Sequence, residues 1–162
     1  KVDLLEAIAR DSTAAFIERQ LADLSPNPSY AARLGSLVRD HVVYFHEHRI
    51  EEAVGLRELQ ELRSQRPEAY AALQEIRRSY QDALQQMITE GCEHGEFSCD
   101  DPHLATLAIL GMLNSINDWF HVGGRRSIDE VADAYAELTV NRLLGATVAT
   151  TPARPRQPRV SR

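Results

Sequence analysis

The sequence has little of what small secreted proteins or membrane proteins depend on. Its 162 residues include two cysteines, Cys92 and Cys99, which are too few for a disulfide framework and favour reduced thiols in the cytoplasm. No apolar run is long enough to cross a bilayer, so we expect no membrane partner. The chain begins at Lys1 without a charged and then apolar leader, so we expect a piece of a longer protein rather than an exported precursor.

The chain is also short of basic residues relative to its acidic content. The formal net charge is −6, although the last stretch contains no acidic residue and four arginines: Arg154, Arg156, Arg159 and Arg162. Without those four, 14 basic residues stand against 24 acidic ones, a formal charge of −10. A body this negative repels phosphate backbones, so these residues should not bind nucleic acid by themselves. We predict one domain over residues 1–146 and a disordered tail, rich in Pro and Arg, over 147–162.

Glycine and proline are scarce, with eight and seven residues, and they separate stretches in which apolar residues recur at the 3.6-residue spacing of helices. Ser29 is expected to cap the second of these stretches, and Ser127 with Glu130 to form a capping box at the last. Prolines in first-turn positions, Pro67 and Pro102, start the fourth and fifth. We therefore predict an all-α fold of six helices over residues 2–24, 29–49, 50–64, 67–91, 102–121 and 128–144.

The predicted fifth helix lacks a polar face. Apolar residues between Leu104 and Phe120 are spread around all of its sides, and one chain of this size cannot easily cover them. Two interpretations stay open: a core helix buried within a monomer, or a helix held between its own core and a partner. We favour a symmetric homodimer in which the last two helices of each chain form a four-helix bundle. The candidate interface residues are Ala108, Gly111, Ser115, Val131, Tyr135 and Leu138.

Patterns for catalysis or metal binding are weak. His46, Glu47 and His48 are sequential and point to different sides of a helix, which fits a solvated helix end better than one metal site. The Cys, Glu and His residues between 92 and 99 lack a Cys-x-x-Cys spacing. The sequence also lacks a glycine-rich phosphate loop, a Ser, His and Asp set in a nucleophile context and the paired Glu-x-x-His motifs of di-iron bundles. We therefore expect no catalytic residues, no metal and no cofactor.

Polar tips on otherwise apolar helix faces indicate where a cavity could form. Such faces on the second and fourth predicted helices carry His41, Phe45, Tyr70, Tyr80 and Met87. This set fits a solid core with satisfied hydroxyls as well as it fits a ligand cavity. Polar side chains on the apolar fifth helix also need partners, and a ligand is one candidate partner. They are Asn114, Asn117 and Asp118.

Two sets of short motifs point to a family. One is the opening Lys1-Val2-Asp3-Leu4-Leu5. The other comprises Gly95-Glu96-Phe97, Asp101-Pro102, Ala105, Gly111-Met112, Asn114, Trp119-Phe120, Gly123-Gly124, Ser127, Glu130 and Tyr135. Together they resemble the tetracycline-repressor (TetR) family of bacterial transcriptional regulators, in which a Lys-x-x-Leu-Leu stretch follows the recognition helix. The second set resembles a branch that includes regulators of lipid, acyl-CoA and steroid catabolism, and the resemblance covers residues 1 to about 145.

This resemblance implies a six-helix effector domain that dimerises through its last two helices. In the family, a helix-turn-helix pair that precedes this domain, and that this sequence does not include, binds operator DNA until an effector releases it. The first predicted helix would be the lever between the two, with Phe16 and Ile17 on the lever side. The implied effector is a small apolar or acyl-type molecule such as an acyl-CoA. The candidate ligand-binding residues, taken from helical faces and the family's usual pocket location, are His41, Phe45, Tyr80, Leu84, Met112 and Trp119.

The leading hypothesis is therefore the effector-sensing and dimerisation domain of a cytoplasmic TetR-like repressor. A helical small-molecule enzyme or carrier without a role on DNA is the alternative, because His41 and two tyrosines could line a pocket. A purely structural dimerisation module is a third possibility.

Overall fold

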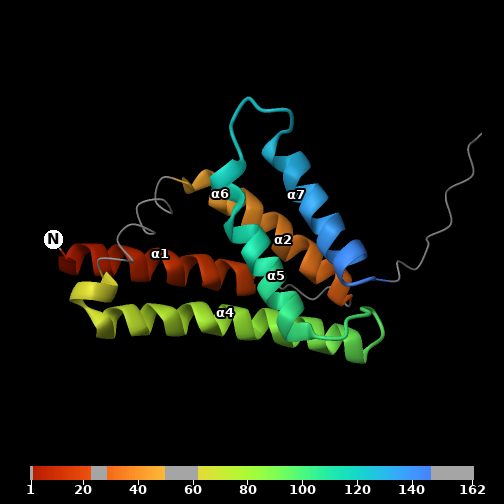
Figure 1. Cartoon of the computed structure of the whole chain (residues 1–162), viewed down its shortest axis with the longest axis horizontal. Helices are drawn as coiled ribbons and strands as arrows, with labels where there is room; N and C mark the ends of the chain where they lie inside the picture. Colours follow the sequence, from red (N-terminus) through yellow and green to blue (C-terminus); the bar gives the residue numbers. More distant parts are fainter. Residues whose placement is uncertain (1, 23–28, 50–61, 147–162) are drawn as a thin grey trace, which may run out of the picture.

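A computed structural model describes residues 2–22, 29–49 and 62–146, and within these ranges the chain is helical and contains no strand (Figure 1). The predicted all-α fold class is confirmed. Of the predicted helix over 50–64, only the last residues fall within the described part, where 62–65 are helical. The predicted tail lies outside it. The elements are α1 (Val2–Ala22), α2 (Tyr30–Glu47), α4 (Pro67–Glu93), α5 (Pro102–Asn114), α6 (Ile116–Trp119), α7 (Ile128–Glu137) and the π-helical turn η1 (Leu138–Leu143).

Local capping explains where these helices begin. Ser29 and Asp101 each accept a hydrogen bond from the backbone amide three residues further on, at 3.3 Å and 2.9 Å. Prolines occupy the first turn of α4 and of α5. Both halves of the predicted capping box form at α7, because the Ser127 hydroxyl accepts from the Glu130 amide and the Glu130 carboxylate accepts from the Ser127 amide.

The prediction of one continuous helix over 102–121 is wrong at Ser115. Here α5 ends, and α6 follows as a single turn. The Ser115 hydroxyl donates to the carbonyl oxygen of Met112 at 2.9 Å, and side-chain bonding of this kind competes with the regular helix. Phe120, which is extended just after α6, packs edge-on against His46 with ring centroids 5.1 Å apart. That contact holds the turn against α2.

The helix α2 lies at the centre of the packing. It contacts α7, α4 and α6, while α1 lies along α4 and α5 packs across α4 (Figure 1). Fully buried apolar side chains from α2, α4, α5, α6 and the end of the domain form the core: Leu34, Val38, Val42, Leu84, Ile88, Ile109, Leu113, Ile116 and Leu144. Burial of each large apolar side chain contributes roughly 1.5–3 kcal/mol. Among the described helices, none combines the length and apolarity that a membrane span requires.

The loop after α4 ties the ends of several helices together. The Glu96 carboxylate accepts hydrogen bonds from the Ser29 hydroxyl at 2.9 Å and from the Ala31 amide at 3.0 Å, at the start of α2. Burial raises the pKa of this carboxyl, but the hydrogen bonds outweigh burial and leave the pKa below its usual value. Gly91 lets the Phe97 ring pack directly on α4, because a Cβ at this position would overlap the ring. The loop therefore fixes how α2 enters the bundle.

Candidate ligand-binding site

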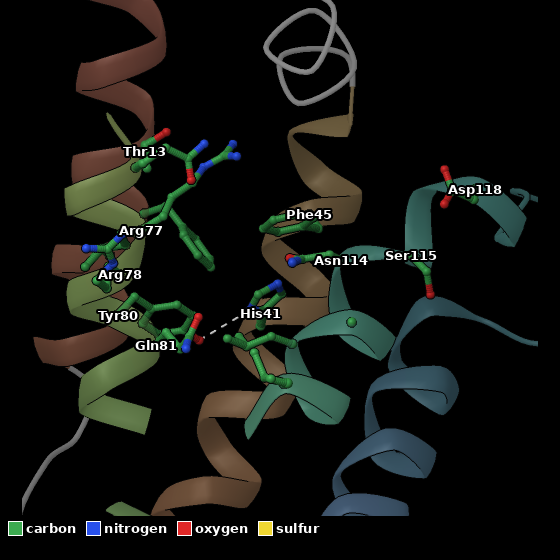
Figure 2. Close-up of a pocket in the computed structure, with 16 residues that line it drawn as sticks. Thr13, His41, Phe45, Arg77, Arg78, Tyr80, Gln81, Asn114, Ser115 and Asp118 are labelled. Atoms are coloured by element: carbon green, nitrogen blue, oxygen red, sulfur yellow. Dashed lines mark hydrogen bonds between the residues drawn. The ribbon is translucent and has the colours of Figure 1, made fainter. Parts of the chain in front are cut away.

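A cavity of about 760 Å³ lies between α1, α2, α4 and α5 and reaches the surface (Figure 2). Small-molecule sites in proteins have volumes of roughly 300–1,000 Å³ and combine an apolar lining with a few polar groups. This cavity has both properties. Buried and half-buried rings form its floor, leucines of α5 line one side, and polar side chains of α4 line the other.

The floor is a cluster of four rings from three helices. The ring of Phe16, on α1, lies edge-on to His41 and Phe45 of α2, with centroids 4.9 Å and 5.3 Å apart. It lies edge-on to Tyr80 of α4 as well, at 5.6 Å. His41 also stacks on Phe45 at 4.4 Å. Edge-on and stacked pairs stabilise such contacts beyond their buried area. Through Phe16, α1 touches the same rings that close the bottom of the cavity.

His41 is the most deeply buried polar group of the floor, with 1 % of its surface exposed. Its Nδ1 atom lies 3.3 Å from the Tyr80 hydroxyl (Figure 2), whereas Nε2 has no hydrogen-bond partner among the described residues. Burial lowers the pKa of the imidazole to about 3, and the nearby side chain of Asn114 opposes this shift. Burial also raises the pKa of the Tyr80 phenol far above its ordinary value. Both groups are therefore neutral at physiological pH.

The polar side of the cavity comes from α4. Gln74, Arg77, Arg78 and Gln81 line it at spacings of three and four residues, so they follow one stripe beside the buried face of the helix. Both arginines are exposed. Arg78 pairs with Glu75 at 3.5 Å, whereas Arg77 forms no ion pair with any residue that the structure describes. This side of the cavity is therefore positively charged although the chain as a whole is acidic.

The opposite side comes from α5 and α6. Leu107 and Leu110 give it an apolar surface, and a side chain at Gly111 would meet nothing within 4 Å. Ser115 lines the cavity at the break between the two helices, and Asp118 lines it on α6. The cavity thus has an apolar centre with cationic groups towards α4 and one carboxylate towards α6.

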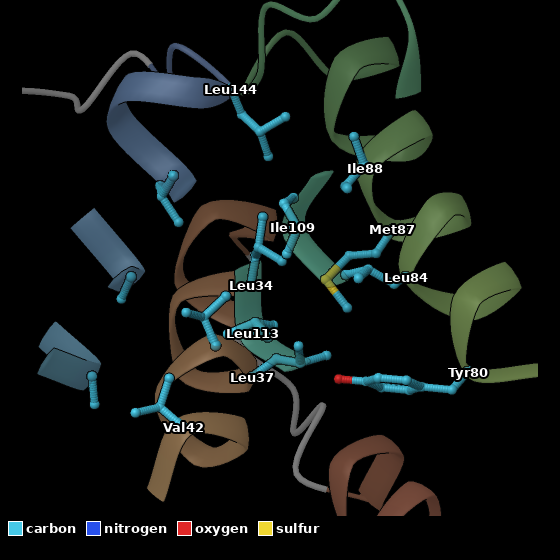
Figure 3. Packing of buried hydrophobic residues seen from close by; sticks show 14 of the residues in the cluster. Leu34, Leu37, Val42, Tyr80, Leu84, Met87, Ile88, Ile109, Leu113 and Leu144 are labelled. Atoms are coloured by element: carbon cyan, nitrogen blue, oxygen red, sulfur yellow. The ribbon is translucent and has the colours of Figure 1, made fainter. Parts of the chain in front are cut away.

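The structure brings together three of the six predicted ligand-binding residues, His41, Phe45 and Tyr80, around this cavity. Leu84 lies one helical turn further along α4 and is buried in the core beside Met87 and Ile88 (Figure 3). Met112 is half-buried on α5 and does not line the cavity. Trp119 lies instead at a second hollow, described below. The role of these residues in ligand binding stays a prediction.

That second hollow, of about 600 Å³, lies between α6, the following loop and α7. The Trp119 side chain is 45 % exposed there, and its ring contacts the rings of Phe120 and Tyr135. Arg125 and Arg126 line its loop side.

Sequence reasoning missed the polar stripe on α4. The spacing of Gln74, Arg77 and Gln81 along one helix edge, directly beside Tyr80, was a signal that could have found it. Thr13 and Ile17 of α1 also line the cavity. Ile17 and Phe16, the predicted lever-side residues, are both buried.

The candidate interface residues fall on different surfaces. Ala108 and Gly111 are exposed on α5, and Leu138 is 44 % exposed at the start of η1. Ser115 and Tyr135 are half-buried, whereas Val131 is buried in the core of its own chain. The dimer interface itself stays a prediction.

No cluster of three or more potential metal ligands occurs among the described residues. Cys92 and Cys99 form no disulfide with each other, and the Cys92 thiol lies 4.0 Å from the Cys99 carbonyl oxygen. Burial is the main cause that raises the pKa of Cys92, which disfavours its thiolate form.

Comparison with known proteins identifies the class. A family model described as the tetracyclin repressor-like C-terminal domain matches residues 27–143, which is most of the chain. The chain therefore belongs to the TetR family of transcriptional regulators, as a C-terminal domain. The predicted family is confirmed, and the enzyme or carrier alternative is not favoured. A search of curated protein sequences finds no match.

Solved structures agree with this fold. A regulatory protein of the tetR family from Rhodococcus RHA1 is 28% identical, with a TM-score of 0.77 over 87% of this chain and 73% of that one. The regulator PfmR from Thermus thermophilus is 26% identical, with a TM-score of 0.70 over 86% and 73%. AibR, solved in complex with isovaleryl coenzyme A and operator DNA, is 21% identical and shares the fold, with a TM-score of 0.73 over 86% and 74%.

Proposed function

We propose that this domain senses a small ligand in the cavity and transmits its occupancy through α1 to a DNA-binding domain outside this sequence, as part of a cytoplasmic repressor. The observation that carries the proposal is the lining of the cavity by α1. Phe16 contacts the buried rings of α2 and α4 and lines the cavity at the same time. A ligand placed there contacts the helix that, by family resemblance, leads to the DNA reader.

Ligand control of this kind requires two postures of the domain. A ligand shifts the balance between them only by its differential affinity, and the coupling to DNA binding is reciprocal. Because Phe16 and Ile17 both line the cavity, a ligand that displaces either side chain favours a different position of α1. The ligand-bound conformation then releases the protein from its operator.

The ligand class that fits best is an acyl-type molecule. The leucines of α5 and the rings of the floor suit an acyl chain, and α4 offers groups for a polar end. AibR, which shares this fold, carries isovaleryl coenzyme A and operator DNA in its structure. An acyl-CoA, or a related lipid or steroid metabolite of similar shape, is therefore the proposed effector.

The functional unit is proposed to be a homodimer built on the last helices. Large apolar side chains remain exposed on α5 and on η1: Leu104, Leu107, Leu138 and Leu143. On α5, the small residues Ala108 and Gly111 are exposed, and another helix can approach closely there. Gly111 and Leu107 also line the cavity, so this interface would border its opening. A four-helix bundle of α5 and α7 with η1 from two chains would cover these residues.

Thermal unfolding of the purified chain with a panel of acyl-CoA thioesters, free fatty acids and sterols tests the proposal. A ligand present at a hundred times its Kd should stabilise the fold by about 2.7 kcal/mol, which raises Tm by several degrees. Hydrogen exchange of the α1 amides should change on binding. Stabilisation without altered α1 exchange would contradict the lever role, and turnover of a thioester would support the enzyme alternative.

A further inference from the structure

One buried polar atom of the cavity lacks a partner. His41 Nε2 forms no hydrogen bond with any described residue, although the imidazole is almost completely buried and lines the cavity. The Asn114 side chain, which also lines the cavity, interacts with the ring as a weak hydrogen-bond partner and opposes the fall of its pKa, but no hydrogen bond of good geometry reaches Nε2. Buried polar atoms are rarely left unpaired, and each exception calls for an explanation. A ligand atom that reaches Nε2 provides one.

The hydrogen bond between the Tyr80 hydroxyl and His41 determines whether the missing partner of Nε2 is a donor or an acceptor. If the hydroxyl donates to His41 Nδ1, the imidazole carries its proton on Nε2, and only that N–H lacks a partner. If Nδ1 donated instead, the hydroxyl proton and the Nε2 lone pair would both be left without partners among the described residues. The first arrangement leaves fewer buried groups unpaired and is therefore the stable one. The missing partner is then an acceptor oxygen.

The charges at the mouth determine where a second polar group would lie. Arg77 precedes Tyr80 by three residues, about 4.5 Å along the axis of α4, and Arg78 is next to it. Asp118 lines the cavity on the side opposite the two arginines (Figure 2), and its carboxylate repels an anion there. A negatively charged group is therefore favoured only on the α4 side, away from the buried imidazole at the floor.

We infer that the cavity binds an anionic acyl compound, in which the carbonyl oxygen accepts a hydrogen bond from His41 Nε2 and a negatively charged group beyond the carbonyl contacts Arg77 and Arg78. The apolar chain lies against Phe16 and Leu110. This inference rests on the proposed function and adds the orientation of the ligand and the residues that read its two polar groups. Neutral apolar molecules of the same length provide a partner neither for His41 Nε2 nor for the two arginines.

Three probes separate the contributions. Octanoyl-CoA carries the acyl chain, the carbonyl and the phosphates, octanoyl-pantetheine lacks the phosphates together with the adenosine, and free CoA lacks the acyl chain. Calorimetry should find that octanoyl-CoA binds at least tenfold more tightly than either of the other two. Raising the salt concentration should lower the affinity for octanoyl-CoA and leave the affinity for octanoyl-pantetheine unchanged, because only octanoyl-CoA binds through exposed charges.

The variant R77Q/R78Q should lower the affinity for octanoyl-CoA to that for octanoyl-pantetheine, whose own affinity should not change. R39Q is the matched control, because Arg39 is exposed and pairs with Asp133 of α7, away from the cavity. H41F should lower the affinity for both octanoyl thioesters about tenfold. The arginine variants keep the inference testable if H41F does not fold, since both arginines are exposed.

Equal affinities for octanoyl-CoA and octanoyl-pantetheine would overturn the inference, as would an equal loss of both in R77Q/R78Q. Binding of neutral apolar ligands alone would overturn it and leave the proposed sensing function standing. Absence of binding by every probe and by the whole ligand panel would count against both.

Discussion

Replacing His41 with phenylalanine should remove a large part of the acid sensitivity of this domain. Burial lowers the pKa of His41 from 6.5 to about 3, so the unfolded chain takes up a proton in this interval and the folded chain does not. Stability is therefore highest above the unfolded pKa and falls as the pH is lowered towards the folded pKa. The slope approaches 1.36 kcal/mol per pH unit only below pH 6.5, where the unfolded imidazole is half protonated, so lowering the pH from 6.5 to 5.0 costs about 1.6 kcal/mol through this group alone.

Urea unfolding followed by circular dichroism, at one protein concentration and at both pH values, measures this effect. The wild-type chain should lose about 1.6 kcal/mol more than H41F on acidification. H121N is the matched control, because His121 is exposed after α6, and it should behave like the wild type. Wild-type and H41F profiles that run parallel between these pH values would refute the burial of a neutral imidazole at the cavity floor.

Three further predictions concern stability and association. G91A should destabilise the fold by about 1–3 kcal/mol in urea unfolding, because its Cβ overlaps the Phe97 ring, and an unchanged midpoint would mean that the loop packs differently. E96Q should cost about 1 kcal/mol at neutral pH, since it weakens the hydrogen bonds to the start of α2, and the cost should shrink as acid protonates the wild-type carboxylate. A108L should fold normally but sediment as a weaker dimer, because Ala108 is exposed on α5 and, unlike Gly111, does not line the cavity; an unchanged dimer would show that the interface lies elsewhere.

Helix limits could be predicted where chemistry within a few residues determines them. Ser29, Asp101 and the pair Ser127 and Glu130 each satisfy backbone amides of their own helix, so no distant contact is needed. The break at Ser115 was missed, because a serine within an apolar helical pattern does not reveal whether its hydroxyl bonds back to the preceding turn.

The site could be predicted only in part. Apolar periodicity placed Tyr80 and Leu84 on one face of α4, but it could not show that the cavity ends between them and that Leu84 belongs to the core. Arg77 has the sequence pattern of an ordinary exposed residue, because its role depends on which edge of α4 faces the opening. That orientation is set by contacts of α4 with α5 and with α1, and α1 lies far away in the sequence.

The central position of α2 constrains how this domain could acquire new ligands. On one side it presents His41 to the cavity, and on another it packs against the closing helices, with Gly35 next to Val140 and Arg39 paired with Asp133. A bulkier residue on the cavity side of α2 would push this helix away from the cavity and disturb its packing against α7 and η1. Ligand specificity should therefore be easier to redesign, or to evolve, along the solvent-facing edge of α4, where side chains can be exchanged without moving a helix that packs on two sides.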